Sequence, residues 1–378
     1  MKIILVCEAV FPENKGGLER WMHWLGKSLS NYGYEVIYFN SKLITEIRDN
    51  IEYFSISNRE WSYNKKGRRS IFQSFLFGIK LFFNLLKSDY DIVYATQAPI
   101  ISLYFIKAAN LLKSRKKILF VEWVEIWPLK YWQSYLGRFV GACAYKVQIS
   151  SLKIGDRKIC FTNKISMRLS QTIPKNQVMK LPGIVMENQI NLETKFTFRD
   201  NIIFLSRFIE EKQPKLAIDT VINFKKLGWN GIFNIIGTGP LLNQIHKYVI
   251  SQNAETYIKI LVNISDQDVK EKFNSSFVLL HTSKREGFGL SIVEAAVQRV
   301  PQIILNYEEN LSTELEIIPN LICNHLQPSD LIDKLNDAYV NQERYFKEVQ
   351  LWLEKRYPDF LGSKSVSIID KEIRSLIG

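Results

Sequence analysis

The segment Ser283–Ala296 combines two acidic residues with a glycine-rich turn. Glu286 and Glu294 stand eight positions apart, and Gly287 and Gly289 lie between them. An apolar run precedes the segment and a helical pattern follows it, so the N–H groups of a helix N-terminus are available there to stabilise a phosphate. We expect Glu286 to project toward a sugar and Glu294 to accept hydrogen bonds from ribose hydroxyls.

Glu294 also has a simpler interpretation. The pattern Ser291-x-x-Glu294 fits a capping box, in which the glutamate only satisfies the N-terminus of its own helix. That alternative leaves Glu286 and the two flanking glycines unexplained.

A second charged loop follows an apolar run that ends at Leu205. Arg207 offers a planar guanidinium and Lys212 a point charge, a pair suited to binding a diphosphate and stabilising the charge that it gains when a sugar leaves. Glu210 and Glu211 stand between them, and this mixture of charges also fits an ordinary solvated loop.

Two glycine pairs mark two further turns. Gly16 and Gly17 open a helical pattern after the first apolar run and leave N–H groups bare for a phosphate, although a plain glycine turn is an equal alternative. Gly237 and Gly239 precede Pro240 in a tight turn that lacks the third glycine of the dinucleotide fingerprint.

These four loops belong to a pattern in which strands alternate with helices, as in a parallel sheet covered on both faces. The pattern occurs twice. In the first half, strands are expected at residues 2–7, 35–39, 51–54, 91–95, 117–121 and 158–162, with helices from about residues 17, 70, 100 and 130. In the second half, strands are expected at residues 202–205, 232–236, 258–262, 277–281 and 302–305, with helices from about residues 214, 240, 266 and 291.

The chain is too long for a single core. Its 378 residues predict two domains, and a polar stretch at residues 186–201 separates the two patterns. We therefore expect an α/β protein with two Rossmann-like, doubly wound domains, residues 1–185 and 186–360, that face each other across a cleft. Ligands of such sheets bind at the carboxyl ends of the strands, where the four loops lie.

The net charge of +12 is concentrated in the first half. Residues 1–180 hold 28 Lys and Arg against 13 Asp and Glu, whereas the other 198 residues hold 22 against 25. No nucleic-acid-binding motif occurs, and Trp and Phe fall mainly in apolar runs, so we do not expect nucleic acid as a partner.

Cysteines and apolar runs favour the cytoplasm. The four cysteines lie far apart without metal-ligand spacing, which is typical of buried free thiols in a reducing compartment. The first apolar run is too short for a secretory signal, and no stretch reaches the length of a membrane span.

The order of these loops resembles glycosyltransferase family 4, whose members have the GT-B fold. The matching motifs extend from residue 11 to about residue 300. They are Gly16-Gly17, Arg207 with Lys212, Gly237-x-Gly239-Pro240, and Glu286 with Glu294 in the arrangement E-x7-E.

The resemblance implies a retaining glycosyltransferase of the hexosyltransferase type that uses a UDP- or GDP-sugar and needs no metal or other cofactor. It implies that residues 1–185 bind the acceptor, that residues 186–360 bind the nucleotide sugar, and that a helix in residues 361–378 crosses back to the first domain. The implied catalytic residues are Glu286, Arg207, Lys212 and Glu125. The implied donor-binding residues are Gly16, Gly17, Arg207, Lys212, Gly237, Gly239, Glu286, Gly287, Phe288, Gly289, Leu290 and Glu294.

One position departs from the family pattern. Members commonly carry a histidine in a segment resembling W-H-E-x-W, but here Val124 stands between Trp123 and Glu125. We expect Glu125 to take part of the missing role. A weakly active family member, or a GT-B epimerase or phosphorylase-like enzyme, remains an alternative.

Residues 65–87 predict a membrane surface as a further partner. Four basic residues precede a helix rich in Phe and Leu, and a basic rim beside an apolar face suits an anionic bilayer. A helix simply packed on its sheet is an equal alternative. We expect a cytoplasmic protein, peripherally associated with the inner face of the cell membrane, that acts on a glycan or lipid-linked acceptor in cell-surface polysaccharide biosynthesis.

Overall fold

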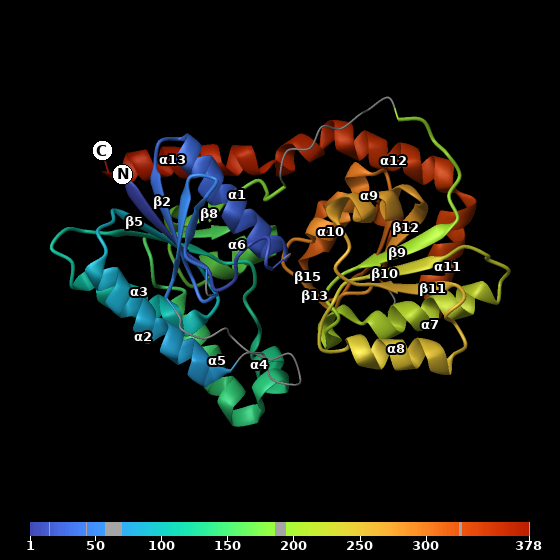
Figure 1. Cartoon of the computed structure of the whole chain (residues 1–378), viewed down its shortest axis with the longest axis horizontal. Helices are drawn as coiled ribbons and strands as arrows, with labels where there is room; N and C mark the ends of the chain where they lie inside the picture. The colour runs from blue at the N-terminus through green and yellow to red at the C-terminus, as the bar shows by residue number, and fades with distance from the viewer. Residues whose placement is uncertain (15, 43, 57–69, 186–193, 325–326, 378) are drawn as a thin grey trace. The chain divides into compact units, whose positions relative to one another are not determined.

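A computed structural model describes residues 1–14, 16–42, 44–56, 70–185, 194–324 and 327–377. The chain divides into two compact units. The N-terminal unit consists of the described residues of 1–185 together with 359–377, and the C-terminal unit consists of the described residues of 194–358. Each unit has its own sheet with helices on both faces (Figure 1).

The N-terminal unit is built on an eight-stranded sheet with the order β3-β4-β2-β1-β5-β6-β7-β8. Neighbouring strands are parallel, except that β3 runs antiparallel to β4. The central strands are buried apolar runs, as expected for strands covered on both faces. The strands are β1 (Lys2–Val6), β2 (Glu35–Asn40), β3 (Glu46–Arg48), β4 (Ile51–Ser55), β5 (Ile92–Thr96), β6 (Ile118–Glu122), β7 (Arg157–Cys160) and β8 (Val178–Lys180).

Several helices of this unit pack by burying one apolar stripe each. Gly78 and Gly141 permit close helix contacts, because a Cβ at Gly78 would lie 2.2 Å from the Phe105 ring and one at Gly141 would lie 2.3 Å from the Trp132 carbonyl oxygen. The helices are α1 (Gly17–Asn31), α2 (Ile71–Lys87), α3 (Ile100–Leu111), α4 (Leu129–Leu136), α5 (Arg138–Ser151), α6 (Asn163–Ser170) and α13 (Gly362–Ile377).

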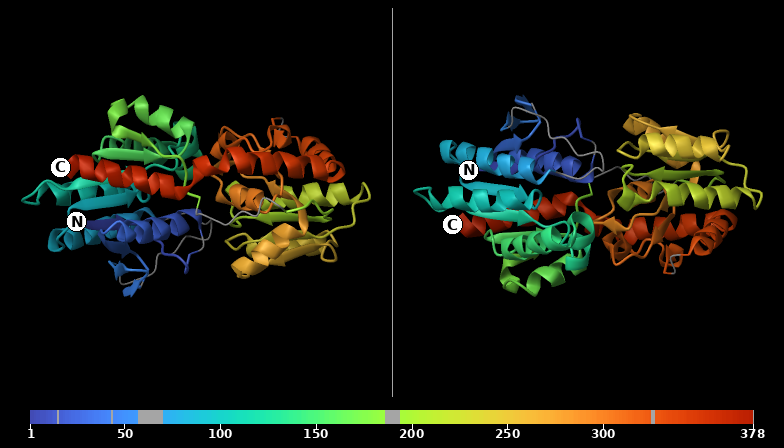
Figure 2. Two further views of the ribbon diagram at one scale, coloured as in Figure 1. Left: turned by 90° about the horizontal axis from the view of Figure 1, so that it is seen from above. Right: turned by 90° about the horizontal axis from the view of Figure 1, so that it is seen from below.

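Helix α13 ends the described chain and packs against α1 of the N-terminal unit (Figure 2). The Ser365 hydroxyl donates to the Gly183 carbonyl at 2.6 Å and accepts from the Gly183 N–H at 3.2 Å. Tyr34 donates to Asp370 at 2.7 Å. These buried contacts tie the last helix to the rest of the N-terminal unit.

The C-terminal unit has a six-stranded parallel sheet with the order β11-β10-β9-β12-β14-β16, and a separate ladder joins β13 to β15. The strands are β9 (Asn201–Leu205), β10 (Phe233–Ile236), β11 (Ile258–Leu261), β12 (Ser276–His281), β13 (Arg285–Glu286), β14 (Gln302–Leu305), β15 (Glu309–Asn310) and β16 (Ile322–Cys323). The helices are α7 (Pro214–Lys225), α8 (Leu242–Ser251), α9 (Asp266–Asn274), α10 (Leu290–Val297), α11 (Pro328–Val340) and α12 (Gln342–Lys355).

Two sheets of mainly parallel strands confirm the α/β class predicted from the sequence. The prediction of buried thiols is wrong for Cys143, which is exposed on α5, whereas Cys7, Cys160 and Cys323 are buried. None of the described helices is both long enough and apolar enough to span a membrane.

Candidate active site

Lys212 and Glu286 meet beyond the carboxyl ends of the neighbouring strands β9 and β12. Lys212 ends the short 3-10 helix η2 (Glu210–Lys212), and its Nζ donates to Glu286 Oε2 and, at 3.2 Å, to the Arg285 carbonyl. Lys212 is 8% exposed. Burial opposes ionisation of Glu286, but the charge of Lys212 and the contact with His281 outweigh it, so the pKa of Glu286 lies below its ordinary value.

His281 is a second partner of Glu286. It is the last residue of β12, and its Nε2 lies 3.3 Å from Glu286 Oε2 and 3.3 Å from Ser283 Oγ. The side chain is buried, and its Nδ1 has no hydrogen bond to any described residue. Reasoning from the sequence missed His281, although a histidine at the end of an apolar run five positions before Glu286 was a usable signal.

A short ladder fixes the backbone at Glu286. Strand β13 pairs with β15, with Glu286 in register with Asn310. Asn310 is 1% exposed, and its Nδ2 donates to the carbonyls of Ser283 at 3.1 Å and Leu305 at 2.9 Å. This anchoring residue was also missed, because its role depends on a pairing that no local pattern reveals.

The loop that carries Arg207 and Lys212 is bonded to the loop that carries Glu286. Thr282 Oγ1 donates to the Lys212 carbonyl at 2.9 Å, and Gln213 Nε2 donates to the Thr282 carbonyl at 2.7 Å. The guanidinium of Arg207 is exposed and makes no hydrogen bond or ion pair with another described residue. The two loops therefore form one preorganised edge beyond the carboxyl ends of β9 and β12, and Arg207 is an exposed cation on this edge.

Gly237 and Gly239 support this edge from the adjacent strand β10. Their φ angles are 153° and 154°, and a Cβ would lie 1.9 Å from the Ser206 carbonyl oxygen or 2.6 Å from the Phe208 carbonyl oxygen. The glycines are thus required for close packing against the Arg207 loop. Their predicted contact with the donor stays a prediction.

Helix α10 begins directly after the Glu286 loop. Its N-cap is Gly289, with φ of 90°, and no side chain caps the helix. The capping-box interpretation of Ser291 and Glu294 is therefore wrong, because Ser291 lies inside the helix. Gly287, Phe288 and Gly289 are buried, while Leu290 and Glu294 are partly exposed on α10.

Three predicted site residues, Gly16, Gly17 and Glu125, belong to the N-terminal unit. Gly16 is the N-cap of α1, where a Cβ would lie 2.1 Å from Glu19 Oε2. Glu125 follows β6, and its Oε2 accepts from Trp127 Nε1 at 2.6 Å. The joint action of these residues with the C-terminal edge stays a prediction.

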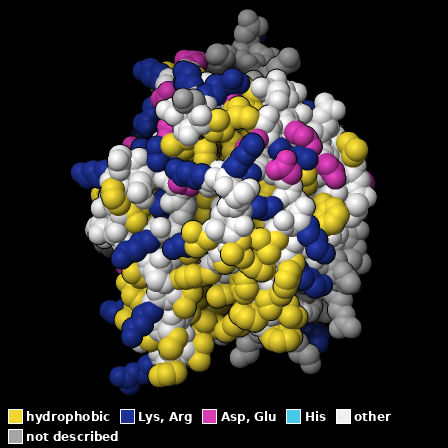
Figure 3. Space-filling model, turned by 90° about the vertical axis from the view of Figure 1, so that its left-hand side faces the viewer, with side chains coloured by type: hydrophobic (Ala, Val, Ile, Leu, Met, Phe, Trp, Pro, Cys, Tyr) yellow, Lys and Arg dark blue, Asp and Glu magenta, His cyan; other side chains and the backbone are white. Residues whose placement is uncertain are grey.

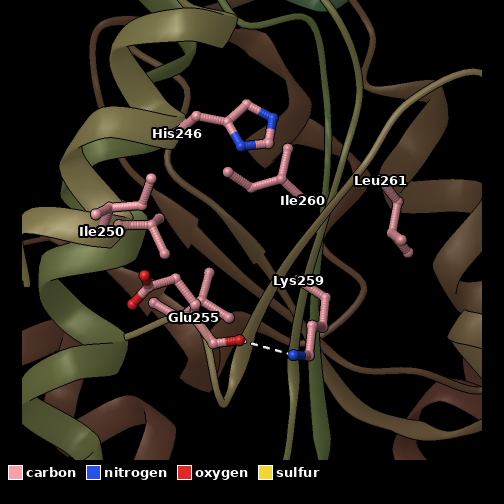
Figure 4. A pocket seen from close by; sticks show the side chains of 8 residues that line it. His246, Ile250, Glu255, Lys259, Ile260 and Leu261 are labelled. Carbon is pink, nitrogen blue, oxygen red and sulfur yellow. Dashed lines mark hydrogen bonds between the residues drawn. The ribbon is translucent and has the colours of Figure 1, made fainter. Parts of the chain in front are cut away.

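A groove of about 360 Å³ lies elsewhere in the C-terminal unit, between α8 and the edge strand β11 (Figure 4). Its lining includes His246, Ile250 and Glu255, and the Lys259 Nζ donates to the Glu255 carbonyl across one end at 2.7 Å. None of the predicted site residues lines this groove. Among the residues with described positions, no cluster of three or more His, Cys, Asp or Glu side chains could hold a metal ion.

A family model and several curated glycosyltransferases match this chain. Residues 186–348 match the family model "Glycosyl transferases group 1". The alpha-monoglucosyldiacylglycerol synthase of Acholeplasma laidlawii is 27% identical over 46% of this chain and 45% of its own length. The amylovoran biosynthesis glycosyltransferase AmsD of Erwinia amylovora is 22% identical over 80% of each chain.

The fold has close counterparts among solved structures. The Anabaena protein Alr3699/HepE, crystallised with UDP-glucose, superposes with a TM-score of 0.71 over 100% of this chain and 99% of its own, at 14% identity. Its likeness concerns the fold. The family match and the ordered set of charged and glycine-rich loops confirm the resemblance derived from the sequence: residues 186–348 form a glycosyl transferase group 1 region, and the chain is a glycosyltransferase of GT-B fold.

Proposed function

We propose that this chain is a retaining hexosyltransferase that moves a sugar from a UDP-sugar to a lipid-linked glycan during synthesis of a cell-surface polysaccharide. The observation that carries the proposal is the edge formed by Arg207, Lys212 and Glu286 at the start of α10. The UDP-glucose bound to the Anabaena structure favours UDP over GDP, and the names of the two relatives favour a lipid or polysaccharide product.

The donor diphosphate has three sources of positive potential at this edge. The exposed guanidinium of Arg207 supplies a bidentate fork, Lys212 supplies a buried charge, and the N-terminus of α10 supplies unpaired N–H groups. Charge accumulates on the diphosphate as the glycosidic bond breaks, so fixed cations there stabilise the transition state more than the bound donor.

Glu286 has a different task at the same edge. Lys212 and His281 keep its carboxylate ionised and hold one oxygen in place. An ionised carboxylate accepts hydrogen bonds only, and sugar hydroxyls donate them. Glu286 therefore orients the transferred sugar, while backbone groups of residues 287–290 complete the sugar site.

Thermal unfolding with nucleotides tests the donor proposal. Ligand that binds only the folded state at about 100 times its Kd stabilises that state by roughly 2.7 kcal/mol. We expect UDP and one UDP-sugar to raise Tm in the presence of EDTA, with GDP weaker. Equal shifts with both nucleotides would remove the preference for UDP, and no shift with either would contradict the proposed site.

Formation of an epimerised donor without transfer would favour the epimerase alternative.

A specific observation also supports membrane contact by the N-terminal unit. The basic residues Lys65, Lys66, Arg68 and Arg69 lie outside the described residues, but α2 follows them directly. Ile71 and Phe72 in its first turn are 61% and 69% exposed, and Phe75 is 47% exposed. Figure 3 shows hydrophobic side chains gathered on this side of the molecule, with Lys and Arg around them.

Charge and packing together make this surface suitable for an anionic bilayer. Residues 61–88 and 126–155 contain no Asp or Glu, and Phe139 at the start of α5 is 81% exposed. The alternative of a packed helix accounts for only part of α2, because Phe77, Leu81 and Leu85 are buried while its first two turns are not. Exposed aromatic residues beside cations suit the interface of a bilayer with anionic lipids.

A further inference from the structure

A cluster of four aromatic rings follows β6 in the N-terminal unit. Trp127 is its centre, with ring centroids 4.8, 4.6 and 5.5 Å from those of Tyr131, Trp132 and Tyr135. Tyr131 and Tyr135 stand one helical turn apart on α4, with nearly parallel rings. All four side chains are only partly buried, so the cluster reaches the surface of its unit.

A buried glutamine holds this aromatic cluster in place. Gln148 of α5 is 1% exposed, and its Oε1 accepts from the Trp127 N–H and from Trp132 Nε1, each at 3.1 Å. Its Nε2 donates to the Trp127 carbonyl at 2.9 Å. Gly141 lets α5 approach the Trp132 carbonyl. The rings are therefore ordered before a ligand arrives, which lowers the entropic cost of binding.

Two polar side chains, Glu125 and Gln97, lie next to the aromatic cluster. Glu125 Oε2 already accepts from Trp127 Nε1, which orients the carboxylate along the cluster. The Glu125 N–H donates to Gln97 Oε1 at 3.1 Å, which brings in a side chain that follows β5. The site thus lies at the carboxyl ends of two neighbouring strands, the edge at which doubly wound sheets bind ligands.

We propose that the aromatic cluster, with Glu125 and Gln97, is a subsite that binds one saccharide residue of the acceptor. This inference rests on the proposed function and names the part of the acceptor that the enzyme recognises. The C–H face of a pyranose is apolar and stacks on an aromatic ring, while its hydroxyls need donors and acceptors at the rim. Aromatic walls with a few fixed polar groups are typical of small-ligand sites.

A bilayer is a less suitable occupant of the same rings. Glu125 carries a negative charge beside Trp127, and an anionic membrane surface would repel it. Burial of that charge in hydrocarbon is costly. Phe139 at the start of α5 is 81% exposed and belongs to residues 126–155, a stretch of the sequence without Asp or Glu. We therefore assign the lipid contact to α2 and Phe139, and the sugar contact to the aromatic cluster.

Saturation-transfer NMR on the full chain tests the subsite with methyl glycosides of glucose, galactose and N-acetylglucosamine as probes. We expect the protein to bind at least one of them without donor. Tyr131→Ala and Tyr135→Ala should weaken that binding roughly three- to tenfold by removing one stacking surface. Tyr131→Phe, which keeps the ring, should restore most of it. In transfer to p-nitrophenyl glycosides, the alanine variants should raise the acceptor KM with little change in donor KM.

Tyr32→Ala is the matched control, because Tyr32 is a 43% exposed tyrosine of the same unit outside the cluster. Binding of UDP distinguishes a failure of the subsite from a failure of the donor site. The subsite alone would be overturned if the wild type bound UDP but no glycoside. It would also be overturned if the alanine variants bound the glycoside as tightly as the wild type. Wild type that binds no nucleotide would contradict the donor site instead. Loss of vesicle binding in Tyr131→Ala, with glycoside binding intact, would assign the cluster to the bilayer.

Discussion

Lys212 and Glu286 form an ion pair across 74 positions of the chain. The pair joins the cation that we assign to the diphosphate with the carboxylate that we assign to the sugar. Removing either partner leaves the other partly buried without its opposite charge, so single substitutions act on both halves of the donor site. A double-mutant cycle at these positions should therefore be strongly non-additive.

Glu286→Gln is expected to remove most transfer activity without unfolding the protein. The substitution keeps the shape of the side chain but deletes the charge beside the reacting sugar, and loss of one such electrostatic group typically costs on the order of 100-fold in kcat. Initial rates with the authentic donor measure the effect. Glu255→Gln, an exposed position of the same unit, serves as control. Turnover near that of wild type would make Glu286 a structural residue.

Arg207→Ala and Lys212→Ala should each weaken binding of UDP by roughly 1.5 to 3 kcal/mol, the worth of a charge-assisted hydrogen bond. We expect the larger loss for Lys212→Ala, because it leaves the negative charge of Glu286 without its main partner. Calorimetric titration with UDP measures both, with Lys226→Ala as control. Wild type should bind UDP and turn over in EDTA. Complete loss of activity in EDTA would contradict the metal-free mechanism.

His281 is a positioning residue for Glu286 in this scheme. His281→Phe removes the ring nitrogen 3.3 Å from Glu286 Oε2, and loss of a hydrogen bond of roughly 1.5 kcal/mol lowers kcat about tenfold. His281→Gln can still donate to the carboxylate and should restore part of the loss. Steady-state kinetics should show the change in kcat and much less in donor KM. Equal losses in both variants would show that a hydrogen-bond donor alone does not replace the imidazole, and full activity of His281→Phe would show that the site needs only the volume of the ring.

Local sequence pattern accounts for the main elements of the fold. Buried parallel strands such as β1, β5 and β12 are continuous apolar runs, which a short window of sequence reveals. Strands β13 and β15 have only two residues each and carry polar side chains, so their pairing depends on contacts distant in sequence. The helix expected from residue 130 is divided at Gly137, where φ is 89°.

The candidate site could be predicted only in part, because it also depends on contacts between residues that are distant in sequence. Arg207, Lys212 and Glu286 stand in motifs whose order is visible along the chain. The partners that fix them are not: His281 and Asn310 act through side-chain contacts made after the strands have assembled. For Gly237, the sequence indicates a tight turn, but the structure shows that the backbone of Ser206 excludes any larger residue.

Glu122 should make the stability of the N-terminal unit depend on pH. It is fully buried on β6, where its Oε2 accepts from Trp21 Nε1 at 2.9 Å and from the Tyr94 hydroxyl at 2.5 Å. Burial raises the pKa of Glu122 from 4.5 to about 7, although both hydrogen bonds favour the ionised form. Because the pKa of Glu122 is higher in the folded than in the unfolded state, the folded state binds this proton more tightly. The contribution of Glu122 to the free energy of unfolding is therefore fully present below pH 4.5 and is lost as pH rises through about 7.

Chemical denaturation across this pH range measures that contribution, whose upper limit is roughly 3 kcal/mol from the size of the pKa shift. We expect the free energy of unfolding to fall between about pH 5 and pH 7.5 in wild type, and the fall to be smaller in Glu122→Gln, which does not titrate. Identical pH profiles for the two proteins would show that Glu122 is ionised in the folded state without cost.

Membrane binding through residues 65–87 should require the four basic residues before α2. Near an anionic surface each is worth about 1 kcal/mol, and the attraction fades beyond a Debye length of about 10 Å at moderate salt. We expect wild type to sediment with vesicles that contain phosphatidylglycerol and to be released in part as salt is raised. Serine at Lys65, Lys66, Arg68 and Arg69 should remove the salt-sensitive part of the sedimentation and leave activity on a water-soluble acceptor analogue unchanged.

The exposed aromatic residues of α2 should supply the part of this binding that salt does not remove. Phe72 and Phe75 are exposed, so serine at both positions costs little stability but removes apolar area that could enter the bilayer interface. Serine at Lys226, Lys247, Lys259 and Lys270 of the C-terminal unit gives a control with the same change in net charge. If this control loses vesicle binding as fully as the variant with serine at Lys65, Lys66, Arg68 and Arg69 does, overall charge explains the attraction. If wild type does not sediment with the vesicles at all, the lipid-linked acceptor loses its structural support.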